Sequence, residues 1–199
     1  MMTEYLARAA KKRKVAWGIT GSGDRLPETI GIMREIKEEY RSEVDVRVYL
    51  SKAGEQVVKW YKVYDQLRQN FEKVSVEFNS NSPFLAGGLE LGKFEFLLIA
   101  PATSNTVAKI AAGITDTLLC NSAIMALKGF VPVYIMPSDY KEGAVVTRLP
   151  NGKDLRLRVR KEDAENTRRL SLMESVSLLE KPEDIRKVFK KHFSPKEQK

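Results

Sequence analysis

Two glycines and a serine follow a short apolar run near the start of the chain, and these residue types could hold an anion. The run occupies residues 15–20, and its last residue, Thr20, is followed by Gly21-Ser22-Gly23. Glycines let backbone N–H groups approach a phosphate closely, and a serine hydroxyl beside a helix N-terminus adds a further donor. A tight strand-to-helix turn favours the same residues, so this segment alone leaves a phosphate site and a plain turn both open.

Three more polar segments follow apolar runs further along the chain. Ser51-Lys52 comes after the alternating run 44–50 and suits a phosphate, although serine is a common helix cap and the cap is the stronger interpretation of this pair alone. Pro101-Ala102-Thr103-Ser104-Asn105-Thr106 follows the most apolar run and carries four consecutive hydrogen-bonding side chains. One such side chain is enough to cap a helix, so functional use is favoured there. The last segment is Pro137-Ser138-Asp139-Tyr140.

Alternating strand and helix patterns must position these four segments. Apolar or alternating runs predict strands at 15–20, 44–50, 74–78, 94–100 and 131–136. Helical spacing of apolar residues predicts helices that begin at Pro27, span 54–71, end at Leu91, and lie around 107–114 and 117–127. Apolar strands separated by helices are typical of a parallel sheet with helices on both faces. Ligands of such α/β sheets bind at the carboxyl ends of the strands, where all four polar segments are expected.

The C-terminal part of the chain has a different pattern. Alternating segments at 145–149 and 155–159 flank Pro150-Asn151-Gly152-Lys153, and Asn-Gly is a strong hairpin signal. Two helical patterns follow, and Pro182 opens the second. We expect a single domain over residues 14–199, with a hairpin excursion at 144–160, C-terminal helices at 161–193 and a basic extension at 1–13.

Composition excludes several classes of site. The chain has 199 residues, one cysteine and one histidine. A single cysteine and a single histidine exclude a disulfide framework and Cys-rich or multi-His metal sites, so no metal is expected. Cys120 is interpreted as a buried inert thiol and His192 as a residue at the solvent edge. No apolar run approaches the roughly 18 residues of a membrane span, and the first residues lack an apolar leader, so a soluble cytoplasmic protein without membrane contact is expected.

The chain is basic, with 34 Lys and Arg against 26 Asp and Glu, which gives a formal net charge of +8. The basic residues gather at 11–14, 156–161 and 187–191. Such clusters can serve nucleic acid, an acidic membrane face or an acidic protein. None is interleaved with aromatic residues as a base-stacking platform would be, so solvated faces are favoured and nucleic acid is not the expected partner.

Two of the polar segments, and the helix after the second, resemble a known family. The sequence resembles the flavoprotein family of flavin-containing cysteine decarboxylases and their relatives over residues 14–140, at Gly21-Ser22-Gly23, at Pro101-Ala102-Thr103-Ser104-Asn105-Thr106, and at Lys109, Ala112-Gly113-Ile114, Asp116 and Leu118-Leu119. Within that family it is most similar to archaeal flavoproteins that take electrons from ferredoxin, with dihydromethanopterin reductases as near relatives. The resemblance implies a three-layer, flavodoxin-like or Rossmann-like α/β fold, to which the C-terminal hairpin and helices are added.

The resemblance also implies FMN as the cofactor. The FMN phosphate would lie on Gly21, Ser22, Gly23 and Ser51, and residues 103–106 would line the phosphate, ribityl and ring region. The residues by themselves indicate an anion at these loops and do not distinguish FMN from another phosphorylated ligand. The expected cofactor-binding residues are Thr20, Gly21, Ser22, Gly23, Ser51, Lys52, Ala102, Thr103, Ser104, Asn105, Thr106, Pro137, Ser138 and Asp139.

Two departures from the family pattern argue against decarboxylation. The decarboxylases use a histidine between the second strand and the Asn-Thr motif, and residues 51–100 contain none. The family's Pro-Ala-Met-Asn signature reads Pro137-Ser138-Asp139-Tyr140 here. A redox role of the flavin does not need either of these features, because the isoalloxazine ring itself accepts and donates electrons. No catalytic side chain is therefore expected.

We therefore expect an FMN electron-transfer protein that accepts electrons from ferredoxin or another acidic redox protein and passes them to a redox partner. One alternative is a flavin-dependent reductase of a pterin-like molecule, and a second is a non-redox phosphate-ligand or RNA-binding module. Relatives of this type are trimer-based, so a homo-oligomer is expected. The aromatic residues on the flavin side would anchor its interface, and these are Trp60, Tyr61, Phe71 and Phe84. Trp60 and Tyr61 could instead stack on the flavin or lie in the core.

Overall fold

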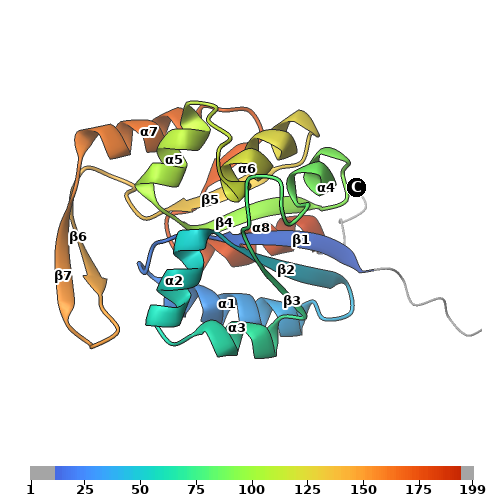
Figure 1. Ribbon diagram of the computed structural model, residues 1–199, viewed down its shortest axis with the longest axis horizontal. Helices are drawn as coiled ribbons and strands as arrows, with labels where there is room; N and C mark the ends of the chain where they lie inside the picture. Colours follow the sequence, from blue (N-terminus) through green and yellow to red (C-terminus); the bar gives the residue numbers. More distant parts are fainter. Residues whose placement is uncertain (1–11, 194–199) are drawn as a thin grey trace, which may run out of the picture.

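The computed structural model describes residues 12–193, which form a parallel sheet between two layers of helices (Figure 1). The sheet has six strands in the order β3-β2-β1-β4-β5-β8, and every neighbouring pair is parallel. The order reverses between β1 and β4, which creates a topological switch point there. The strands are β1 (Arg13–Ile19), β2 (Val44–Leu50), β3 (Lys73–Val76), β4 (Phe96–Ala102), β5 (Val133–Pro137) and β8 (Val176–Leu178).

Eight helices cover the two faces of this sheet in the described part of the chain. Helices α1, α2, α3 and α8 pack on one face, and α4, α5, α6 and α7 pack on the other (Figure 1). The fold is therefore a three-layer α/β arrangement as predicted, and of the two forms that the resemblance implies, the strand order is the Rossmann-like one. The helices are α1 (Leu26–Glu39), α2 (Lys52–Trp60), α3 (Tyr64–Asn70), α4 (Ala86–Glu90), α5 (Ser104–Ala111), α6 (Leu118–Lys128), α7 (Lys161–Ser171) and α8 (Asp184–Phe193).

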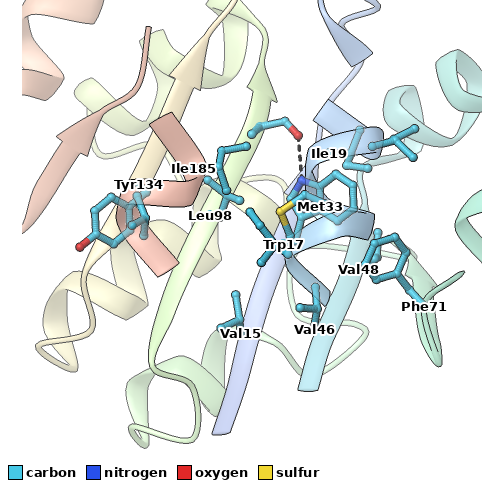
Figure 2. Packing of buried hydrophobic residues seen from close by; sticks show 14 of the residues in the cluster. Val15, Trp17, Ile19, Met33, Val46, Val48, Phe71, Leu98, Tyr134 and Ile185 are labelled. Atoms are coloured by element: carbon cyan, nitrogen blue, oxygen red, sulfur yellow. Dashed lines mark hydrogen bonds between the residues drawn. The ribbon is translucent and has the colours of Figure 1, made fainter. Parts of the chain in front are cut away.

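Strand β1 shows how the sequence divides the core between the two layers. Successive side chains of a strand point to opposite faces, so Trp17 and Ile19 join the core under α1 while Ala16 joins the core under α5 and α6. Trp17 is fully buried, and its indole N–H donates to the carbonyl of Ala100 at 2.8 Å (Figure 2). This bond satisfies the buried donor and links β1 to the end of β4, which holds the switch point together.

Phe71 also belongs to this core, which corrects its expected place in a subunit interface. Its side chain is 2% exposed, and its ring meets that of Trp17 edge to face with centroids 5.3 Å apart (Figure 2). Burying a phenylalanine contributes roughly 1.5–3 kcal/mol to folding. Phe71 therefore stabilises the monomer and offers no surface to a partner.

A separate antiparallel hairpin projects from the body beside α2 (Figure 1). It consists of β6 (Gly143–Arg148) and β7 (Asp154–Val159), and Gly152 at its tip has a φ of 79°, which glycine adopts without the steric cost that other residues incur. The hairpin pairs Val145 with Leu157 and Val146 with Arg156. Directly paired residues share a face, so one face carries apolar side chains and the other carries arginines.

Several element boundaries differ from those predicted. The helix predicted over 54–71 is two helices, α2 and α3, because the chain turns at Lys62, whose φ is 58°. Phe78 lies beyond the end of β3 and is 75% exposed. The short edge strand β8 has no counterpart among the predicted elements.

The start of the chain also differs from its prediction. Arg13 pairs with Val44 as the first residue of β1, so the described end of the basic cluster is ordered strand and not extension. The rest of the predicted extension, residues 1–11, lies outside the described residues. None of the helices within residues 12–193 has the length and apolar sequence needed to cross a membrane.

Candidate functional site

The loops after β1 and β4 meet at the switch point and are joined there by Thr20. The hydroxyl of Thr20 donates to the carbonyl of Pro101 at 2.8 Å and accepts from the backbone N–H of Thr103 at 2.8 Å. Thr20 is 1% exposed, so its side chain is used within the protein. Thr20 therefore positions the two predicted ligand loops against each other.

A cleft of about 270 Å3 opens where these loops meet the loop after β5. Its polar wall consists of residues predicted from the sequence, namely Gly21, Ser22, Gly23, Thr103, Ser104, Ser138 and Asp139. Opposite lies an apolar wall that the hairpin supplies through Val145, Leu149, Leu155 and Leu157. The cleft thus offers donors and acceptors on one side and a water-excluding surface on the other, which suits a ligand with a polar chain and a flat apolar ring.

Hydroxyl contacts hold the three loops of the polar wall in place. Ser138 donates to the hydroxyl oxygen of Ser22 at 2.6 Å, and the hydroxyl of Ser104 donates to the carboxylate of Asp139. The backbone N–H of Asp24 also donates to the Ser22 oxygen, at 3.2 Å. Because both contacts use Ser22 as an acceptor, its own hydroxyl proton is directed elsewhere and can reach a ligand in the cleft.

The second predicted segment acts as a helix cap. The hydroxyl of Ser51 accepts from the backbone N–H of Gly54 at 2.9 Å, as an N-cap serine does. The neighbouring N–H of Lys52 donates to the carboxylate of Glu77 at 3.2 Å, and Glu77 also accepts from the N–H of Leu118 at 3.1 Å. Glu77 thereby bridges the starts of α2 and α6, a contact that the sequence analysis missed. Ser51 and Lys52 lie at the start of α2, on the side of the β1 loop away from the cleft, and do not line the cleft.

Two glycines bring the loop after β1 close to α2. A Cβ on Gly21 would lie 2.7 Å from the Cβ of Ala53, and a Cβ on Gly23 would lie 2.3 Å from the hydroxyl oxygen of Tyr61. A side chain at Gly21 would push against Ala53 and force the backbone apart, whereas a side chain at Gly23 would displace the end of the Tyr61 side chain. The two glycines therefore form a cradle that presents backbone rather than side chain to the cleft.

Other predicted residues support the cleft from outside it. Ala102 is buried within β4, and Thr106 hydrogen bonds to the hydroxyl of Thr103 at 3.1 Å, which fixes the start of α5. Asn105 is exposed and does not line the cleft. Pro137 is buried at the end of β5 and lines a neighbouring cavity.

The aromatic pair at the end of α2 borders the cleft, and Tyr61 also packs against the core while Trp60 does not. Trp60 is 57% exposed and meets Tyr61 edge to face with ring centroids 5.4 Å apart. The hydroxyl of Tyr61 donates to the carbonyl of Arg148 at 3.0 Å, which ties the hairpin to α2. Both rings line the cleft, and because they are nearly perpendicular, only one of them could stack face to face on a planar ligand.

Asp24 is a functional candidate that the sequence analysis did not single out. Its carboxylate accepts from the hydroxyl of Thr147 in the hairpin at 3.4 Å, a long contact. Burial raises the pKa of this carboxyl, while the nearby Arg25 guanidinium acts in the opposite direction. No sequence pattern marks Asp24, because its partner is 123 residues away and the hairpin is needed to bury it.

A larger cavity of about 990 Å3 adjoins the cleft on the side of α1. The two spaces share residues at their common wall, which include Gly23, Asp24, Tyr61 and Ser138. Charged residues line the rest of the cavity, and two of the cations are engaged with Glu180: Arg25 donates to its carbonyl at 2.5 Å and Lys141 lies 3.5 Å from its carboxylate.

The remaining two sequence interpretations concern isolated residues. Cys120 is buried in α6, as predicted, and burial raises the pKa of its thiol, which disfavours the reactive thiolate. His192 is half-buried and bonds through Nε2 to the hydroxyl of Tyr134 at 2.9 Å. Its carbonyl accepts from Arg13 at the start of β1, which places His192 near the amino ends of the strands, opposite the cleft at their carboxyl ends.

Comparison with known proteins gives consistent matches. The family model described as Flavoprotein matches residues 3–142. An uncharacterized protein of Methanocaldococcus jannaschii, MJ0730, is 52% identical over 185 residues, which cover 93% of this chain and 98% of the relative. A dihydromethanopterin reductase (acceptor) of the same organism is 34% identical in an alignment 236 residues long, and the alignment covers 88% of this chain and 95% of the reductase.

A solved structure matches over nearly the same range. The crystal structure of Burkholderia xenovorans DmrB in complex with FMN, described as a cubic protein cage for redox transfer, superposes with a TM-score of 0.77. It is 33% identical to this chain, and the match covers 93% of this chain and 97% of DmrB.

Proposed function

The chain belongs to the Flavoprotein family with FMN as its cofactor, and we propose that the cleft under the hairpin holds this FMN. One observation carries the proposal: three polar loops at the switch point face the apolar side of the hairpin across a single cleft. The redox role of a flavoprotein follows from the family and its relatives, and it displaces the alternative of a non-redox RNA-binding module.

The residues of the cleft fit the parts of an FMN molecule. The cradle of Gly21 and Gly23 would present backbone N–H groups to the phosphate, and the free hydroxyl proton of Ser22 would add a donor. Tyr61 and Leu157 would cover a planar ring and keep water from it. Bound FMN supplies one-electron and two-electron chemistry, so these side chains bind, orient and shield it and need not react themselves.

The same arrangement argues against decarboxylation. The single histidine of the chain is His192, and its bond to Tyr134 lies toward the amino ends of the strands, opposite the cleft. The loop after β5 presents Ser138 and Asp139 to the cleft, both engaged with other loops. No histidine can therefore serve as an acid or base beside the cofactor.

The electron donor that we propose is an acidic redox protein of the ferredoxin type. Arg156 and Arg158 lie on the face of β7 that points away from the cleft. A protein that docks on these two residues would contact the outer side of the hairpin whose inner side forms a wall of the cleft. Opposite charges steer small transient complexes of this kind more than buried area does.

The electron acceptor that we propose is a small pterin-like molecule. Relatives that cover most of this chain are dihydromethanopterin reductases, and the larger cavity lies directly beside the cleft. We also propose a homo-oligomer, because the related DmrB forms a cage.

An absorption spectrum of the purified protein tests the central proposal. Bound FMN gives a yellow protein whose flavin bands are bleached by a chemical reductant and return with air. A colourless protein that takes up no added FMN would contradict the proposed function. Binding of RNA with no flavin bands would restore the non-redox alternative.

A further inference from the structure

The cavity of about 990 Å3 has no role in holding the phosphate loops, although it lies directly beside the cleft. Its walls are the start of α1, the strand β6 and the loop at residues 140–142. Gly23, Asp24 and Tyr61 separate it from the cleft and line both spaces. A ligand in the cavity would therefore lie side by side with a ligand in the cleft.

Asp24 is the group on this shared wall that lacks a full set of partners. Its Oδ1 takes one long contact from Thr147 at 3.4 Å, and no ion pair to its carboxylate is formed within residues 12–193. The adjacent Arg25 has a left-handed backbone, with a φ of 51°, and its guanidinium donates to the carbonyl of Glu180. Half-buried carboxylate oxygens without donors are costly, and a ligand with N–H groups would compensate them.

The other charges of the cavity favour the same kind of ligand. Arg25 and Lys141 are both held by Glu180, which weakens their pull on an anionic ligand. Val145 and Leu149 add apolar surface next to the ring of Tyr61. Glu28, Glu142 and Arg148 also line the cavity, but Asp24 is the carboxylate that lies on the wall shared with the cleft, and its oxygens can accept hydrogen bonds from a ligand there.

We propose that this cavity binds the second reactant and that Asp24 is its specificity-determining residue. The two carboxylate oxygens would accept from adjacent N–H groups of a planar 2-amino-4-oxo nitrogen heterocycle, in the paired geometry that a guanidinium-like edge offers. The inference rests on the proposed function, which places FMN in the neighbouring cleft. A site built around such a carboxylate disfavours a ring without the N–H groups, because the half-buried carboxylate would then keep only its long contact from Thr147.

Equilibrium dialysis of two pteridines against the FMN-loaded protein tests this assignment. Pterin carries the 2-amino and ring N–H groups, and 1,3-dimethyllumazine has a similar ring without them. The parent and the exposed-surface control Asp65→Asn are expected to bind pterin at least about tenfold more tightly than dimethyllumazine. Asp24→Asn should lose about tenfold or more of the pterin affinity and most of the discrimination, because the amide offers one acceptor where the carboxylate offers two.

A second variant and the flavin absorbance separate the outcomes. Thr147→Val leaves the charge of Asp24 and removes the hydroxyl beside it, so it should weaken pterin binding less than Asp24→Asn does. Equal pterin binding by the parent and Asp24→Asn would overturn the inference, and so would equal binding of the two pteridines or loss of FMN from Asp24→Asn. Flavin bands without any pterin binding would end this inference and leave the proposed function standing, whereas absent flavin bands in the parent would end the proposed function.

Discussion

Ser22 shows how a single side chain can be prepared for a ligand by its neighbours. Its oxygen accepts from Ser138 at 2.6 Å and from the N–H of Asp24 at 3.2 Å, so its rotation is fixed and its proton remains to be donated. Little rotational freedom is then lost when a ligand binds. Sequence analysis identifies Ser22 as a donor beside a helix, but the contact with Ser138 joins residues 116 positions apart and needed the structure.

Ser22→Ala is therefore expected to weaken FMN binding by about tenfold or more. The variant removes a charge-assisted hydrogen bond, worth on the order of 1.5–3 kcal/mol, and leaves the Ser138 hydroxyl without its acceptor. Flavin fluorescence released on dilution measures the loss. Ser171→Ala is the matched control, because that exposed hydroxyl on α7 donates only to the carbonyl of Arg168, and equal FMN retention in both variants would refute the role of Ser22.

Gly23→Ala tests the cradle beside Tyr61. The new Cβ would lie 2.3 Å from the hydroxyl oxygen of Tyr61, so the ring must move and its bond to Arg148 must break. Reduced FMN affinity is expected with little loss of folding stability, because the displaced atom is the free end of a side chain. Gly31→Ala is the control: nothing lies within 4 Å of its Cβ position inside α1, and it should raise the free energy of unfolding by about 0.5–1 kcal/mol. Unchanged FMN affinity in Gly23→Ala would contradict the cradle.

The hairpin is the element that gives the cleft its second wall. Leu155 and Leu157 of β7 line the cleft, while Arg156 and Arg158 alternate with them and point to the opposite face. The sequence predicts the hairpin from its alternation and its Asn-Gly turn. It does not predict where the hairpin lies, because that depends on contacts such as Tyr61 with Arg148, which join residues far apart in the chain.

The basic clusters differ in what they offer a docking partner. Arg160 is held by Asp163 through two hydrogen bonds, of 2.8 and 2.7 Å, and Lys187 is held by Asp184 at 2.8 Å. The end of α8 lies near the amino ends of the strands, opposite the cleft. Of these basic residues, Arg156 and Arg158 are thus the ones that remain near the cleft, on the hairpin that forms its wall.

Arg156→Glu with Arg158→Glu should slow reduction of the flavin by reduced ferredoxin by about tenfold or more at low ionic strength. Stopped-flow measurements over a salt series should show a second-order rate constant that falls with salt in the parent and is already low in the variant. Lys190→Glu with Lys191→Glu places the same charge change at the end of α8 and should have a smaller effect. A rate constant indifferent to salt and to the hairpin variant would remove the charge argument.

Helix α8 should make the stability depend on pH through His192. The ring packs 4.8 Å from that of Phe96, and burial lowers the pKa of His192, helped by the nearby Lys191 and Arg13 and opposed by Glu95. The unfolded chain, with an ordinary pKa of about 6.5, then binds the proton more readily than the folded protein, so stability falls as the pH drops below about 6.5. Above that value this contribution to stability is fully present.

His192→Gln removes this titration. Urea unfolding at about pH 8 and about pH 5 should show that the parent loses more free energy of unfolding on acidification than the variant does. The bond between Nε2 and Tyr134 is lost at both pH values, so it lowers the stability of the variant without adding a slope. Parallel losses in the parent and the variant would show that His192 titrates normally in the folded protein.

For the molecule as a whole, the sequence predicts the layers more reliably than it predicts the contacts between them. Residues 44–50 form a strand as predicted, since alternation is a local property that pairing only reinforces. The break at Lys62 was missed because it needs a left-handed backbone conformation, and the 54–71 pattern has no glycine or asparagine at that position to indicate one. Phe71 was assigned to an interface because its burial against Trp17 joins residues distant in sequence.

Exposed apolar side chains around α4 bear on the assembly of the whole molecule. The exposed fractions are 71% for Phe84, 64% for Leu91 and 91% for Phe130. Phe84, just before α4, lies over Gly87 of that helix, Leu91 follows the end of the helix, and Gly129, just before Phe130, lies close to Glu90, so the three residues flank α4. Exposed patches of this kind mark interfaces, and covering each large apolar side chain is worth roughly 1.5–3 kcal/mol.

Light scattering of the FMN-loaded protein is therefore expected to return a multiple of the 22.6 kDa monomer mass, and the trimer-based assembly that the family resemblance implies requires a multiple of three. Phe84→Glu with Phe130→Glu should shift the mass toward the monomer, because two buried charges without partners oppose the contact. Leu172→Glu is the control, since Leu172 is 80% exposed at the end of α7 on its own. A parent that scatters as a monomer with FMN bound would reject the homo-oligomer. An oligomer that survives the double substitution would place the interface elsewhere, with the exposed Trp60 at the mouth of the cleft as the next residue to change.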